Sequence, residues 1–93
     1  MEKPNNKHKA FQELTELMKQ TLRTIKEIDY WLEVELSLLE QYENQIRSGD
    51  DTKWLLLTEN CIVHSKTKSL IESERLRQLS LKRKIYIDYL KEK

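Results

Sequence analysis

The residues of this chain whose side chains could do chemistry are few and poorly spaced for it. Cys61 and His64 lie one helical turn apart and could share a metal ion. A structural zinc site takes four ligands, however, and the remaining two are missing. Because a lone cysteine usually behaves as a small apolar residue, we expect no metal site at this position.

The acidic residues do not form a catalytic pair. Glu33 and Glu35 are two positions apart, so on a helix they point to different sides. Asp50 and Asp51 are better suited to capping a helix. The Glu-x-x-His motif of di-metal bundles is absent, and one glycine in the whole chain excludes a glycine-rich phosphate loop. We therefore expect a protein that is not an enzyme and that binds no cofactor or small molecule.

The first half of the chain carries apolar residues at a strict seven-residue interval, namely Phe11, Met18, Ile25, Leu32, Leu39 and Ile46. Leu14, Ile28 and Tyr42 follow every second one of these by three residues. This pattern predicts one long helix with a buried seam. Trp31 and two leucines widen the apolar stripe, which suits a helical bundle better than a two-stranded zipper.

Breaking residues are scarce, since 93 residues include one glycine and one proline, and 35% of the chain is charged. We expect a polar, flexible tail over residues 1–7, with Asn5 or Asn6 as N-cap, and a single helical domain over 8–93. Its first helix should span about 8–47, a turn 48–51 and a second helix about 52–91, with Gly49 in the left-handed conformation. Two helices of equal length around one turn predict an all-α, coiled-coil-like antiparallel hairpin.

The second helix is apolar on two sides. We expect Met18, Ile25, Ile28, Leu32, Leu39 and Tyr42 to pack on one of them, formed by Leu57, Cys61, Leu76, Leu79, Tyr86 and Leu90. The opposite side is the predicted partner interface, with Trp54 beside the turn as an anchor: Leu56, Val63, Leu70, Leu81 and Ile85. Because a helix with two apolar sides is covered on both, we expect a homodimer that forms a four-helix bundle.

Two other structures compete with the hairpin. The polar segment Ser65–Ser69 ends in a capping-box pattern with Glu72, and a break there would give a three-helix bundle. Residues 85–89 are rich in strand-forming types, but no second strand could pair with them, so we expect them to be helical.

Charge is divided between the two ends of the predicted hairpin. Residues 1–26 and 74–93 carry a net charge of +7, and residues 27–73 carry −6. The favoured function is a protein–protein interaction module, acting as an adaptor, an inhibitor or a subunit of a larger helical complex. The alternative is a small DNA- or RNA-binding regulator that uses the basic residues of the second helix, Arg75, Arg77, Lys82, Arg83 and Lys84.

The expected location is the cytoplasm, or the nucleus of a eukaryote. A single cysteine and the lack of an apolar N-terminal segment argue against secretion. No apolar run approaches the length of a membrane span, so we expect no membrane partner.

Overall fold

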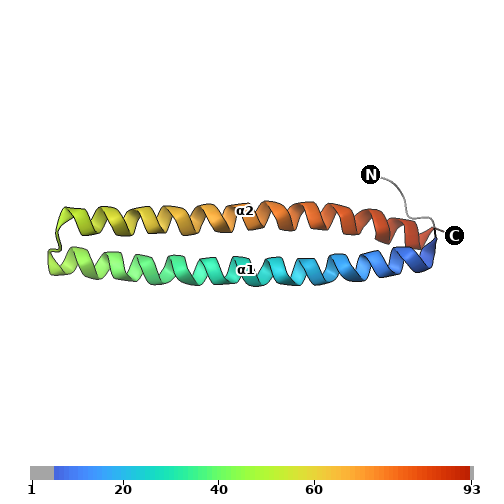
Figure 1. Ribbon diagram of the computed structural model, residues 1–93, viewed down its shortest axis with the longest axis horizontal. Helices are drawn as coiled ribbons and strands as arrows, with labels where there is room; N and C mark the ends of the chain where they lie inside the picture. The colour runs from blue at the N-terminus through green and yellow to red at the C-terminus, as the bar shows by residue number, and fades with distance from the viewer. Residues whose placement is uncertain (1–5, 93) are drawn as a thin grey trace.

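The computed structural model describes residues 6–92, which form two long helices and one turn (Figure 1). Helix α1 spans Lys7–Ser48 and helix α2 spans Thr52–Lys91. They lie side by side along their whole length in an extended hairpin of 67 × 18 × 14 Å (Figure 1). The all-α antiparallel hairpin predicted from the sequence is confirmed, and residues 6–92 contain no strand.

The ends of α1 are fixed by two residues of the expected types. Asn6 is extended, and its side-chain oxygen accepts a hydrogen bond of 2.7 Å from the amide of Lys9. At the other end Gly49 has φ 70°, a left-handed conformation that glycine adopts without strain. The amides of Gly49 and Asp50 return to the carbonyl oxygens of Ile46 and Gln45. Asn5, the other N-cap candidate, lies outside the described residues.

Helix α2 runs without interruption through Ser65–Ser69, so the alternative break into three helices is wrong. The hydroxyl of Ser69 donates to the carbonyl of Lys66 in its own helix and does not cap a new one. The carboxylate of Glu72 pairs with Arg75 at 3.3 Å and does not reach back toward Ser69. Residues 85–89 are helical, as expected.

The two helices meet along rows of buried and half-buried residues spaced alternately three and four apart, which we call the hairpin seam. On α1 the seam consists of Ala10, Leu14, Leu17, Thr21, Thr24, Ile28, Trp31, Glu35, Leu38, Tyr42 and Gln45. On α2 it consists of Leu55, Thr58, Ile62, Ser65, Ser69, Glu72, Leu76, Leu79, Arg83, Tyr86 and Leu90. The most buried members are mainly small or hydroxyl-bearing: Ala10, Leu17, Thr21, Thr24, Thr58, Ser65, Ser69 and Leu79.

Most of the buried hydroxyls are satisfied inside their own helix. Thr21 donates to the carbonyl of Leu17 at 2.8 Å, and Ser65 donates to that of Ile62 at 2.9 Å. Thr58 instead crosses the seam and donates to the side-chain oxygen of Gln45 at 2.8 Å. A small, satisfied side chain allows the helices to approach closely, but it buries little apolar area. The seam therefore fixes the pairing of the helices while contributing modest hydrophobic stabilisation.

The expected packing between the helices is wrong for half of its residues. Ile28, Tyr42, Leu76, Leu79, Tyr86 and Leu90 do lie in the seam, but Met18, Ile25, Leu32, Leu39, Leu57 and Cys61 are exposed. On α1 the seam lies one residue earlier than the heptad of large apolar residues. One residue corresponds to a rotation of about 100°, which moves those residues out to the side of the hairpin.

Candidate functional site

An apolar surface runs the length of α1 and remains largely exposed in the hairpin. This α1 stripe consists of Phe11, Met18, Ile25, Leu32, Leu39 and Ile46, with Leu22 and Leu36 beside them. Their exposed fractions range from 39% to 67%. Each of the six regularly spaced residues directly follows a seam residue, so the stripe faces about 100° away from α2. Exposed apolar surface of this extent typically marks an interaction site.

The predicted partner interface on α2 is brought together only in part. Leu56, Val63 and Leu70 each follow a seam residue directly and form one exposed row in the turn-proximal half, with exposed fractions of 54–63%. Leu81 is exposed on the back of the helix, two positions after the seam residue Leu79.

The other two members of that predicted interface lie elsewhere. Ile85 is half-buried, so less of its side chain is accessible to a partner. Trp54 is exposed but precedes the seam residue Leu55, which places it on the opposite side of the seam from Leu56. We use the name α2 row for Leu56, Val63 and Leu70.

An open apolar hollow of about 460 Å³ lies between the helices, lined by Trp31, Val34, Leu38, Leu57, Asn60, Cys61, His64 and Ser65. The rings of Trp31 and His64 meet edge to face, with centroids 5.9 Å apart. Cys61 is an exposed free thiol, and residues 6–92 contain no group of three metal-ligating side chains. Sequence analysis missed this hollow because its residues come from both helices.

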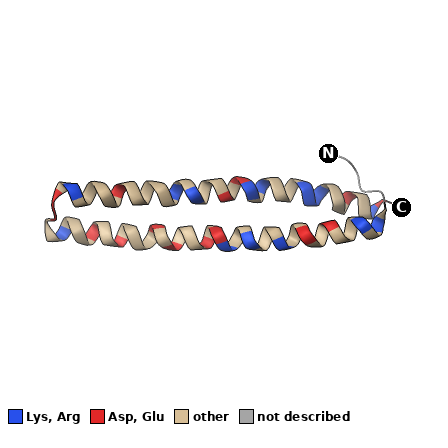
Figure 2. Ribbon diagram, viewed as in Figure 1, with Lys and Arg blue, Asp and Glu red and all other residues tan. Residues whose placement is uncertain are grey.

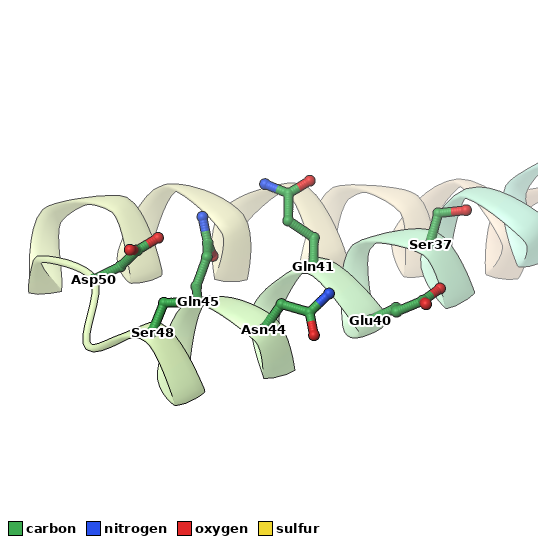
Figure 3. Close-up of a pocket in the computed structure, with 7 residues that line it drawn as sticks. All are labelled: Ser37, Glu40, Gln41, Asn44, Gln45, Ser48 and Asp50. Carbon is green, nitrogen blue, oxygen red and sulfur yellow. The ribbon is translucent and has the colours of Figure 1, made fainter.

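A second hollow, of about 370 Å³, lies beside the turn and is polar. Figure 3 shows its side chains spread along the end of α1 and the turn, without converging on one point: Ser37, Glu40, Gln41, Asn44, Gln45, Ser48 and Asp50. Gln45 is already bonded to Thr58 across the seam, and no histidine lines the hollow to act as a base.

Charge is separated along the hairpin. Among the described residues, 6–26 and 74–92 carry a net charge of +6, and 27–73 carry −6. Figure 2 shows Lys and Arg gathered along the terminal half of α2, and Asp and Glu along the turn-proximal half of α1. One end of the rod is therefore basic and the other acidic.

The five predicted nucleic-acid contacts do not share one face. Arg75 pairs with Glu72, and Arg77 pairs with Glu74 at 2.7 Å. The hydrogen bonds from Arg77 and Gln78 lower the pKa of Glu74 to about 2. Arg83 and Lys82 lie in two different places, the first half-buried in the seam and the second exposed.

Arg83 lies in the seam and donates from Nη1 to the sulfur of Met18 at 3.4 Å. Its Nε is buried without a hydrogen-bond partner. Lys82 is exposed and lines a hollow of about 500 Å³ together with Arg75 and, from α1, Arg23. This is the place where the structure gathers cations from both helices.

No protein-family model, curated protein or solved structure matches this chain. Within residues 6–92, neither helix has a stretch that is both long and apolar enough to cross a membrane.

Proposed function

We propose that this chain is a non-enzymatic protein-interaction module that packs its exposed apolar surfaces against the helices of other chains. One observation carries the proposal: the most buried seam residues are mainly Ala, Thr and Ser, while seventeen large apolar side chains of residues 6–92 are 38–67% exposed. This is the reverse of a self-sufficient core, in which large apolar residues are the most often buried.

The exposed surface area supports the same proposal. The chain exposes 7198 Å². A typical folded monomer of 11.3 kDa exposes about 5,700 Å², so the excess is roughly 1,500 Å². A standard interface takes about 800 Å² from each partner. The excess is large enough to supply one such interface and part of another.

The hairpin suits the role of an adaptor, an inhibitor or a subunit of a larger helical complex. A rigid rod with an apolar row on one helix presents residues about two turns apart, the i and i+7 spacing with which a helix docks into a groove or a bundle. We assign the α2 row to a different protein, because its apolar residues occupy only the acidic half of the rod. The acidic half would favour a partner with basic residues around its apolar groove.

Site-specific photo-crosslinking in cells of the source organism tests this function. A photoreactive residue at Leu70, in the α2 row, should give adducts of discrete mass with another protein. The same residue at Thr67, which is exposed on the polar back of α2, is the matched control and should give none. Val63→Asp should abolish the adducts formed at Leu70. Equal labelling at both positions, or adducts that survive Val63→Asp, would contradict the proposal.

The second candidate function is nucleic-acid binding, favoured by the cations that line the 500 Å³ hollow. If Arg23, Arg75 and Lys82 contact phosphates there, replacing all three by Gln should weaken binding of every duplex to a similar degree. The dependence of binding on salt should also become shallower by about one unit per lost contact. Lys84→Gln is the control, because Lys84 is exposed on another side of α2. Binding that is unchanged in the triple variant would exclude this hollow.

A further inference from the structure

We infer that the α1 stripe is the docking surface for a second copy of this chain, packed antiparallel on the first with the two-fold axis beside Asp29. The inference rests on the proposed function and names one of its partners. It also moves self-association from α2, where the sequence predicts it, to α1. The stripe, its flanking charges and its position relative to α2 each support this assignment.

The position of the stripe leaves room for a second hairpin. Its residues lie about 100° around α1 from the seam, so a helix that packs on them does not displace α2. They also repeat every seven residues from Phe11 to Ile46, with Leu22 and Leu36 four positions after Met18 and Leu32. This alternation of three and four is the pattern that a coiled-coil partner requires. Helix α1 thus carries two such seams, of which α2 occupies one.

The stripe is complementary to itself in the antiparallel direction. It is centred between residues 28 and 29, so an antiparallel copy aligned on this centre covers its whole length. Phe11 then lies opposite Ile46 of the second copy. Two further pairs follow with the same spacing, Met18 with Leu39 and Ile25 with Leu32. A large side chain therefore faces another large apolar side chain at each of these positions.

Charges beside the stripe select the same direction. Lys19, Lys26, Glu33 and Glu40 directly follow stripe residues, and all four are exposed. In the antiparallel alignment Lys19 lies beside Glu40 of the second copy, and Lys26 lies beside Glu33. In a parallel alignment each of them would lie beside the residue five positions earlier in the second copy, namely Leu14, Thr21, Ile28 and Glu35, none of which supplies an opposite charge. The opposite charges of these flanking positions therefore favour the antiparallel dimer.

Asp29 lies at the centre of the row Leu22–Asp29–Leu36 and faces its own equivalent across the axis. Two carboxylates at this distance repel, so Asp29 weakens the dimer that the rest of the stripe favours. Asp29→Asn should therefore raise the association constant about threefold or more. If the stripe docks a different protein, no such gain in the association constant is expected. The repulsion exists only where a two-fold axis brings two copies of Asp29 together.

Disulfide trapping tests the inference with purified full-length chain in which Cys61, the single native cysteine, is replaced by Ser. Under mild oxidation Asp29→Cys should form a disulfide-linked dimer rapidly, because the axis brings the two cysteines together. Met18→Cys is the control, since its two copies would be roughly 30 Å apart in the antiparallel dimer but adjacent in a parallel one. The double variant Lys19→Cys/Glu40→Cys should cross-link, because residue 19 lies beside residue 40 of the second copy.

Each result of the cross-linking experiment either supports or overturns the antiparallel dimer. Rapid cross-linking of Met18→Cys alone would show a parallel dimer and overturn the inference. A chain that is helical by circular dichroism but monomeric by light scattering, with no cross-link in any variant, would also overturn it. That result would leave the heterologous adducts at Leu70 standing, so failure here is distinguishable from failure of the proposed function. Leu32→Glu should abolish cross-linking of Asp29→Cys if the stripe forms the contact.

Discussion

The hydroxyl of Tyr42 on α1 donates a hydrogen bond to the carboxylate of Glu59 on α2, which joins the two helices at the turn-proximal end of the seam. A reciprocal pair lies at the other end, where Tyr86 of α2 is bonded to Glu13 of α1. These hydrogen bonds raise the pKa of both phenols, and desolvation and the nearby carboxylate charge act in the same direction. The seam is thus bridged near each end by a Tyr–Glu pair.

The Tyr–Glu pairs predict a loss of stability at alkaline pH. A phenol whose pKa is raised on folding contributes stability that is fully present below its unfolded value of 10.0. This contribution is lost as pH rises through the higher pKa of the folded state. Thermal unfolding followed by circular dichroism should show the midpoint falling above pH 10. In Tyr42→Phe/Tyr86→Phe this part of the fall should disappear, whereas Tyr30→Phe, a change at an exposed side chain, should behave as wild type.

Glu74 is expected to remain ionised to unusually low pH. Its pKa is lowered to about 2 from 4.5 by hydrogen bonds from Arg77 and Gln78. A lowered pKa contributes stability above pH 4.5 that is lost as pH falls toward 2. Titration of the side-chain carboxyl by NMR should place its midpoint near 2, and Arg77→Gln should move that midpoint upward. An unchanged midpoint in Arg77→Gln would contradict the pairing.

Ser65 tests whether the seam is held by close packing or by its hydroxyl. The side chain is completely buried and donates only to its own helix. Ser65→Ala should therefore change the free energy of unfolding little, by less than about 0.5 kcal/mol. Ser65→Leu should destabilise the hairpin by roughly 1–3 kcal/mol, because the larger side chain forces the helices apart. Urea unfolding of both variants measures the difference, and equal stabilities would show that the seam is loosely packed.

Charge reversal at the flank of the α1 stripe tests the antiparallel register independently of cysteine chemistry. Lys26→Glu and Glu33→Lys each place like charges opposite one another twice in the dimer, so each should weaken association about 3- to 10-fold at low salt. The double variant restores opposite charges and should associate within about twofold of wild type. Sedimentation equilibrium provides the constants. A double variant as weak as either single one would contradict the pairing of residues 26 and 33.

The two helices and their turn were predictable because their signals are local. Gly49 is the only glycine, Asn6 is a typical N-cap, and the apolar period identifies α1. The face of α1 that meets α2 was not predictable from apolarity. The seam contains residues that are polar by type, such as Thr21, Thr24 and Ser65. Their hydroxyls donate hydrogen bonds to carbonyl oxygens of their own helix, which leaves small carbon surfaces for packing against the other helix.

The candidate interfaces were predictable to a lesser degree. Leu56, Val63 and Leu70 share a heptad position, so the sequence places them on one face. A helical wheel also places Leu81 and Ile85 on that side of α2, but the burial pattern assigns both to other positions, because the wheel does not show where the seam lies. The apolar hollow at Trp31 and His64 depends on the register between α1 and α2, which only the three-dimensional structure supplies.

The angle between the seam and the stripe on α1 determines what kind of assembly these hairpins can build. About 100° is close to the interior angle of a square. In the proposed dimer, α2 would lie on one side of α1 and the second α1 on the adjacent side, so both α2 helices would stand on the same side of the α1 pair. A wider angle would have given an open layer to which hairpins could add without limit. In the proposed dimer each α1 stripe would be used by one two-fold contact, so the single-residue offset between the two heptads would give an assembly of finite size and not a growing fibre.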